Sequence, residues 1–175
     1  MNVSPTGGRR GVACIFAAAT GLRRSEMAAL RWADIDLEAG TVTVRPTVAK
    51  NREEAVQPLP PGTVAALRLH RGTQAPGAAT FPHVPSTKGL RADLKAAGLA
   101  YTTEAGTLDL HALRVTFATL LARSGVSLAQ AQRLMRHSTP ALTANVYTKL
   151  RIEDGHAAVA RIDGASTKEQ RARPT

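Results

Sequence analysis

The 175-residue sequence has one cysteine, few aromatic residues and no long hydrophobic run. Because Cys14 stands alone, no intrachain disulfide can form, a thiolate zinc cluster is not expected, and a reducing cytoplasm is the expected location. No segment approaches the roughly 20 apolar residues that a membrane-spanning helix needs, so no membrane partner is expected. Aromatic residues make up 3% of the chain, which counts against a stacking platform for single-stranded nucleic acid.

Acidic residues are also scarce relative to basic ones. The chain has 23 Lys and Arg against 13 Asp and Glu, a formal net charge of +10, which favours a polyanionic partner. Double-stranded DNA is the first candidate, although a merely basic surface would give the same composition. The length and the 43% apolar content predict a single domain with one sizeable core.

Hydrophobic spacing predicts a mostly helical α+β fold with a small antiparallel sheet. Residues 41–44 alternate with period two and pair with 56–59 in the prediction, and the polar residues 50–54 form the tip of the hairpin. Residues 1–9 are expected to be a flexible tail, 10–163 the domain, and 164–175 a second flexible tail. Helical spacing is found in residues 12–20, 25–31, 63–71, 90–97, 110–124, 128–135 and 140–150.

Several polar side chains remain once the apolar stripe of each helix is assigned to the core. His111 and Arg114 are three residues apart, so they are expected to point the same way, away from the stripe of Phe117. Taken singly, each of these residues has an ordinary structural explanation, such as a surface arginine or a tyrosine at the edge of the core. No Cys or Glu stands at ligand spacing from the histidines, so no metal site is expected. The residues left over are Arg23, His111, Arg114, His137 and Tyr147.

Three segments resemble the signature segments of the tyrosine recombinase (phage integrase-like) catalytic domain, in the family's order. They read ATGLRRSEMAALRWADIDL, HALRVTFATLLARSG and LMRHSTPALTANVYTKL. The resemblance extends over roughly residues 12 to 152, and KGLRADLKAAGL also resembles the family's helix before the second signature. It implies the fold of that catalytic domain and the breaking and rejoining of DNA.

The resemblance assigns the arginines first. Arg23 matches the family's first catalytic arginine, and His111 and Arg114 match its His-x-x-Arg pair. Glu26 resembles the acidic residue that orients the arginine or supports the fold. Planar guanidinium groups donate paired hydrogen bonds to phosphate oxygens, which suits charge that grows on a phosphate in a transition state.

Tyr147 matches the nucleophile, which would store the broken DNA bond as a phosphotyrosine. His137, ten residues earlier, matches the second histidine, and the two histidines would hydrogen-bond phosphate oxygens or move the proton of the nucleophile. Lys50 matches the hairpin lysine that acts as general acid, with Arg52 as the alternative. No metal is expected, because the cationic side chains would stabilise the charge on the phosphate, and no ATP or other cofactor is expected, because the covalent intermediate conserves the bond energy.

The chain also departs from the family pattern. Only 22 residues precede Arg23, so the family's N-terminal DNA-clamping domain is expected to be absent. Met135 and Arg136 stand where Leu-Gly is common, so Arg136 adds bulk and charge beside His137.

The expected function is site-specific recombination by a homotetramer on two DNA sites, with no small-molecule substrate. Three alternatives stay open: a truncated, inactive DNA-binding remnant of an integrase, a type IB topoisomerase-like activity, and a helix-turn-helix regulator built around the turn at residues 124–126.

Overall fold

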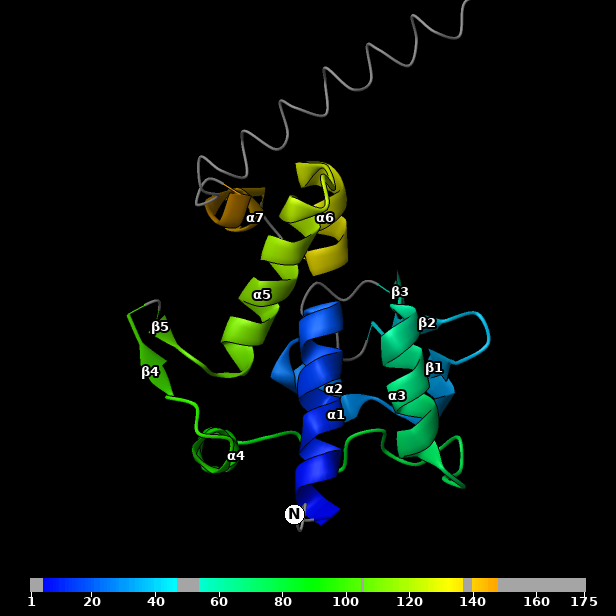
Figure 1. Cartoon of the computed structure of the whole chain (residues 1–175). Coiled ribbons are helices and arrows are strands. Elements are labelled where there is room, and N and C mark those ends of the chain that lie inside the picture. The colour runs from blue at the N-terminus through cyan, green and yellow to red at the C-terminus, as the bar shows by residue number, and fades with distance from the viewer. Residues whose placement is uncertain (1–4, 47–53, 105, 137–139, 148–175) are drawn as a thin grey trace, which may run out of the picture.

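In a computed structural model of the chain, the described residues are 5–46, 54–104, 106–136 and 140–147. Most of them are helical, with a small antiparallel sheet beside the helices, so the predicted fold class is confirmed (Figure 1). The α-helices are α1 (Pro5–Thr20), α2 (Arg24–Ala29), α3 (Pro61–Arg71), α4 (Thr87–Ala96), α5 (Leu110–Arg123), α6 (Leu128–Met135) and α7 (Pro140–Tyr147).

Side-chain caps set the beginnings of two helices that matter for the site. The carboxylate of Asp109 accepts a hydrogen bond from the N–H of Ala112 at 2.8 Å, which starts α5. Ser127 caps α6, and the side chain of Gln130 reaches back to its N–H to complete a capping box. Each cap directly precedes an apolar helical stripe in the sequence, which is typical of an N-cap, and both orient the helices whose other residues reach the site.

The sheet has three antiparallel strands in the order β1-β2-β3, which are β1 (Ile35–Asp36), β2 (Thr41–Val44) and β3 (Ala55–Pro58). The predicted pairing of β2 with β3 is confirmed, and Thr41 lies opposite Pro58. Pro58 is tolerated because β3 is an edge strand. The two-residue strand β1 and the hairpin of β4 (Thr102–Thr103) and β5 (Gly106–Thr107) were not predicted, because two residues are too few to show alternation.

Three expectations concern the ends of elements or of the chain. Helix α1 begins at Pro5, so residues 5–9 of the predicted N-terminal tail are helical, and residues 1–4 lie outside the described residues. Helix α2 has Arg23 as its N-cap, two residues before the predicted start at Ser25. The predicted tail 164–175 lies outside the described residues.

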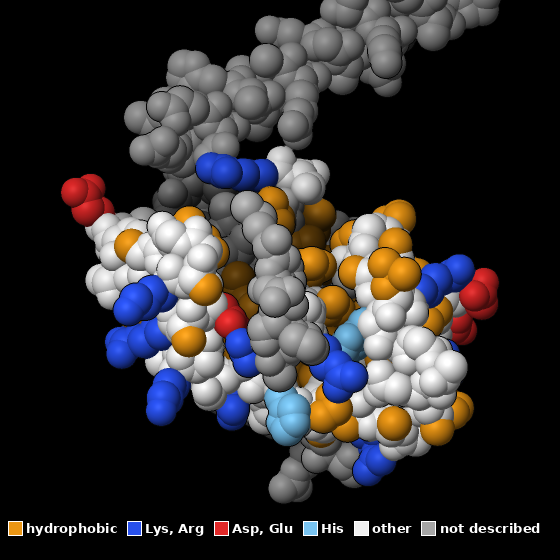
Figure 2. All heavy atoms as spheres, turned by 60° about the horizontal axis from the view of Figure 1, so that its bottom comes forward, with side chains coloured by type: hydrophobic (Ala, Val, Ile, Leu, Met, Phe, Trp, Pro, Cys, Tyr) orange, Lys and Arg blue, Asp and Glu red, His pale blue; other side chains and the backbone are white. Residues whose placement is uncertain are grey.

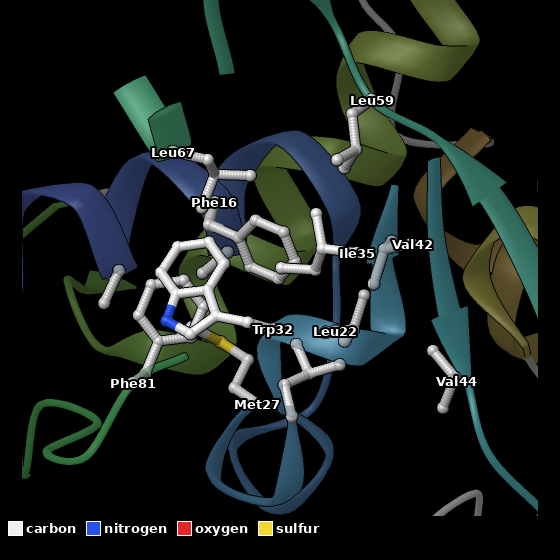
Figure 3. Packing of buried hydrophobic residues seen from close by; sticks show 13 residues of the cluster. Phe16, Leu22, Met27, Trp32, Ile35, Val42, Val44, Leu59, Leu67 and Phe81 are labelled. Carbon is white, nitrogen blue, oxygen red and sulfur yellow. The ribbon is translucent and has the colours of Figure 1, made fainter. Parts of the chain in front are cut away.

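The main core lies between α1, α2, the sheet and α3, around the buried side chains of Phe16, Met27 and Trp32 (Figure 3). A second, smaller cluster of Phe117, Ala118 and Met135 joins α5 to α6.

The two clusters approach each other at Gly21, just after α1. Its φ is +60°, and a Cβ there would lie 2.6 Å from Cδ1 of Phe117 and 3.3 Å from the sulfur of Met135. Glycine is required at this junction on both counts, and the candidate site is built around it.

Candidate active site

Arg114 is a buried residue in the first turn of α5, with 5% of its surface exposed. Its Nη1 donates to the carbonyl of Gly21 and its Nη2 to the carbonyl of Met135. The expectation that Arg114 points away from the Phe117 stripe is wrong, because residues three apart share a helix face and both are buried. His111, one turn earlier, is exposed.

Arg23 stands between α1 and α2 and is held by the side chain of Glu26. Its backbone N–H donates to Oε2 of Glu26 at 2.7 Å, and its Nη1 donates to Oε1 at 2.9 Å. Its Nη2 donates to the carbonyl of Arg136 at 3.2 Å. The side chain of Arg23 is 26% exposed, so it is fixed on the protein side while part of it faces solvent. The orienting contact expected of Glu26 is therefore present.

Arg136 is the third arginine at this place, and sequence reasoning noted it only as added bulk and charge. It is the C-cap of α6 in the left-handed conformation, with φ 51° and ψ 42°. Its Nη2 contacts Oε2 of Glu26 at 3.1 Å, and its Nη1 donates to Oε1 of Gln57 at 2.7 Å. Its place between Met135 and the predicted histidine was the only sequence signal, and that signal does not reveal contacts across the fold. We call Arg23, Glu26, Arg114 and Arg136 the arginine cluster.

The arginine cluster has an excess of positive charge in a poorly solvated place. Burial, and then the charges of Arg23 and Arg136, lower the pKa of Arg114 to about 10. Burial would raise the pKa of Glu26, but Arg136 and the contacts from Arg23 outweigh it and hold that pKa below its ordinary value. Three guanidinium groups and one carboxylate carry a formal charge of +2. Such a cluster favours a bound anion, and a phosphate group matches its fork-shaped donors.

Tyr147, the predicted nucleophile, is not brought to the arginine cluster in this structure. It ends α7, and its hydroxyl donates to the carbonyl of Val126 at 2.9 Å. Val126 follows the C-terminal end of α5, and the helix rises about 14 Å from Arg114 to Arg123 at 1.5 Å per residue. Burial raises the pKa of Tyr147 above its ordinary value.

Of the six predicted site residues, the structure brings together Arg23 and Arg114, and leaves His111 exposed on α5 and Tyr147 on Val126. Lys50, its alternative Arg52, and His137 lie outside the described residues.

In the part of the chain that the structure describes, no three His, Cys, Asp or Glu side chains gather where they could hold a metal ion. None of the described helices is both long enough and apolar enough to cross a membrane.

The chain is thus a mostly helical domain with a positively charged cluster whose donors suit an anionic group. The model of the phage integrase family matches residues 2–153, so the chain belongs to the phage integrase family. Among its relatives is the tyrosine recombinase XerC of Xanthomonas campestris pv. campestris (strain B100), which is 34% identical over 138 residues, or 75% of this chain and 41% of the relative. The XerC of Roseiflexus castenholzii (strain DSM 13941 / HLO8) is 32% identical over 149 residues, or 79% of this chain and 46% of the relative. The chain thus spans less than half of these two relatives.

Solved structures share the fold. The Tn1549 transposon integrase in complex with transposon right end DNA has a TM-score of 0.69 and 21% identity, over 91% of this chain and 60% of that chain. The XerA recombinase has a TM-score of 0.63 and 22% identity, over 92% of this chain and 64% of that chain.

Proposed function

We propose that the chain is the catalytic part of a tyrosine site-specific recombinase, which breaks and rejoins double-stranded DNA through a covalent 3′-phosphotyrosine. The observation that carries this proposal is the arginine cluster. Arg23 and Arg114, which the sequence motifs select from far apart in the chain, meet at one place with an excess of positive charge. Membership of the phage integrase family supports the same activity.

In the proposed reaction, the phenolate oxygen of Tyr147 attacks the scissile phosphorus and the bond to the 5′ oxygen breaks. The leaving 5′ oxygen takes a proton from Lys50 and departs as a hydroxyl. A 5′ hydroxyl of the exchanged strand then attacks the phosphotyrosine, and Tyr147 leaves. One phosphodiester is consumed and one is formed, so the reaction is balanced without an energy source.

Arg23 and Arg114 stabilise the charge that grows on the nonbridging oxygens of the phosphate. Their hydrogen-bond donors are already in place where negative charge develops in the transition state. Such electrostatic stabilisation is usually the largest single contribution to the rate enhancement of an enzyme. His111 and His137 would donate hydrogen bonds to the phosphate or accept the proton of the nucleophile. Tyr147 must leave Val126 to react, and proximity to the guanidinium groups would lower the phenol pKa that burial now raises.

Duplex DNA is the proposed partner because basic side chains also line the surface. Lys88, Arg91 and Lys95 are exposed along α4 at a spacing of three and four residues, which places them on one side of the helix. Figure 2 shows Lys and Arg side chains gathered on the side of the molecule where α4 and the β4–β5 hairpin lie. Such contacts give affinity that falls with salt and carries little sequence information.

In this proposal, four protomers act together on two DNA sites. The reaction takes place in the cytoplasm and uses no small-molecule substrate. Recombination exchanges strands between two duplexes, and each duplex presents two phosphates to be cut, so four copies of the single nucleophile are required.

Covalent trapping tests the proposal, using nicked duplexes tiled across the replicon that encodes the chain. The wild type should form a detergent-resistant adduct, and Tyr147→Phe should not. Tyr101→Phe is the matched control, because Tyr101 is the other tyrosine of the chain and lies against Arg91, with the guanidinium carbon 4.1 Å from its ring centre.

The outcomes separate the alternatives. Salt-sensitive binding without an adduct would contradict the proposal and favour an inactive DNA-binding remnant. Relaxation of supercoiled DNA by a single protomer, without exchange between sites, would favour a topoisomerase-like activity.

A further inference from the structure

Arg136 is a buried cation that no step of the proposed reaction uses. Its side chain is 3% exposed and that of Glu26 is 1% exposed, so both charges of this ion pair are removed from water. One guanidinium nitrogen contacts Glu26 at 3.1 Å, and another donates to Gln57 at 2.7 Å and to the carbonyl of Leu134 at 3.1 Å. The group is therefore committed to protein partners and is not available to DNA.

The backbone at Arg136 is in the left-handed conformation, which residues other than glycine rarely adopt. Among the described residues it is the one non-glycine with a positive φ. The left-handed conformation costs free energy for any residue with a Cβ, and its buried Nε–H adds to that cost because it has no acceptor among the described residues. Glycine at this position would end α6 at a lower cost in free energy, so the guanidinium group itself has a role here.

That use is visible in the partners of Glu26. Oε2 of Glu26 receives the backbone N–H of Arg23 at 2.7 Å and Nη2 of Arg136 at 3.1 Å. The other oxygen, Oε1, receives Nη1 of Arg23 at 2.9 Å. The side chain of Arg136 thus binds the same carboxylate that binds Arg23. The backbone carbonyl of Arg136 also accepts a hydrogen bond from Nη2 of Arg23 at 3.2 Å. The guanidinium of Arg23 is therefore held at two points, by Glu26 through Nη1 and by the carbonyl of Arg136 through Nη2. Both points depend on residue 136.

We propose that Arg136 is a positioning residue for Arg23: through Glu26 and its own carbonyl it fixes the guanidinium that meets the phosphate. Gln57 extends this link, because it accepts Nη1 of Arg136 and its Nε2 donates to the carbonyl of Thr20 at 2.9 Å. Thr20 ends α1 and lies three residues before Arg23. The buried contacts of Arg136 therefore join α2, α6, strand β3 and the end of α1, the segments that carry or flank the site.

This inference rests on the proposed function, and a first experiment tests it without DNA. Arg136→Gly fits the left-handed backbone and removes only the side chain. Amide hydrogen exchange of Arg23, read by NMR on the full chain, should be at least about tenfold faster in this variant. Gly89, whose N–H is held by Ser86 far from the cluster, should exchange as before. An unchanged Arg23 rate would overturn the inference.

A second experiment uses the nicked duplex that gives the adduct, at saturating DNA. Arg136→Gly should slow adduct formation about 100-fold while DNA affinity stays within about threefold. Arg136→Lys keeps the charge but not the fork that reaches both Glu26 and Gln57, so its rate should be intermediate.

A methylphosphonate at the scissile position separates positioning from a general loss of structure. Replacing one nonbridging oxygen by methyl removes the negative charge that Arg23 meets, so the defect of Arg136→Gly should shrink to about fivefold. An equal loss on both substrates would overturn the inference. If the wild type forms no adduct at all, the proposed function fails, and the exchange rate of Arg23 decides this inference alone.

Discussion

The arginine cluster and the environment of Tyr147 differ in how firmly the structure holds them. The guanidinium groups of the cluster lie where α1, α2, α5 and α6 meet, and each one makes two or more hydrogen bonds to carbonyls or to side chains. Tyr147 ends α7, which packs on α5 and α6, and its hydroxyl makes the hydrogen bond to Val126. Folding of the core thus assembles the arginine cluster, while Tyr147, the proposed nucleophile, still has to be brought to it.

Removal of the carboxylate of Glu26, at the centre of the arginine cluster, is expected to have the largest effect. Glu26→Gln leaves two cations facing each other in a buried place, so we expect a loss of about 3 kcal/mol in the free energy of unfolding. Glu38→Gln is the matched control, because Glu38 pairs with Arg68 on the surface, where the pair contributes at most about 0.5 kcal/mol. Urea denaturation at pH 7 measures both, and equal small losses would contradict the account.

The same variant carries a pH signature. The folded pKa of Glu26 is lowered, so its stabilising contribution is present above the ordinary pKa of about 4.3 and is lost as the pH falls through the folded pKa. Glu26→Gln should therefore flatten the loss of stability in acid. A profile that stays as steep as that of the wild type would show that other carboxylates dominate.

A side chain at Gly21, where the two core clusters meet, is expected to push them apart. Gly21→Ala combines a positive φ with a Cβ placed 2.6 Å from the ring of Phe117, so we expect a loss of about 3 kcal/mol from strain and overpacking. It also displaces the carbonyl that accepts from Arg114. Gly62→Ala is the control, since nothing lies within 4 Å of a Cβ there. Thermal or urea unfolding of the two variants measures the difference. A Gly21→Ala variant as stable as the wild type would contradict the prediction.

The smallest effect is expected at Tyr147, the proposed nucleophile. Tyr147→Phe removes the hydrogen bond to Val126 and should cost about 1 kcal/mol of stability.

Because burial raises the pKa of Tyr147, the stability that depends on its protonated form is full below pH 10 and is lost as the pH rises through the folded pKa. In Tyr101→Phe, Tyr147 is the one remaining tyrosine, so ultraviolet titration reads its phenol directly. A pKa at or below 10 without DNA would contradict the buried placement.

Local signals in the sequence predicted most of the fold, and their limits are physical. Asp109 and Ser127 precede apolar helical stripes and do cap α5 and α6. The alternation of residues 41–44 is long enough to reveal β2. Strand β1 has only two residues and pairs through contacts that local periodicity does not encode.

The site was predicted less completely than the fold. The family resemblance selected Arg23 and Arg114, and helical spacing alone misplaced Arg114 because it was grouped with His111 and not with the buried Phe117. The role of Arg136 depends on Glu26 and Gln57, which are 110 and 79 residues away in the chain. Such contacts exist only once the chain is folded.

In the proposed reaction, Tyr147 leaves Val126 and forms a covalent bond to DNA beside the arginine cluster. Mass spectrometry of the trypsin-digested adduct tests it most directly, because cleavage after Arg136 and Lys149 releases Tyr147 in the peptide of residues 137–149. We expect the nucleotide on that peptide. A nucleotide on the peptide of residues 96–114, which contains Tyr101, or on a residue other than tyrosine, would contradict it.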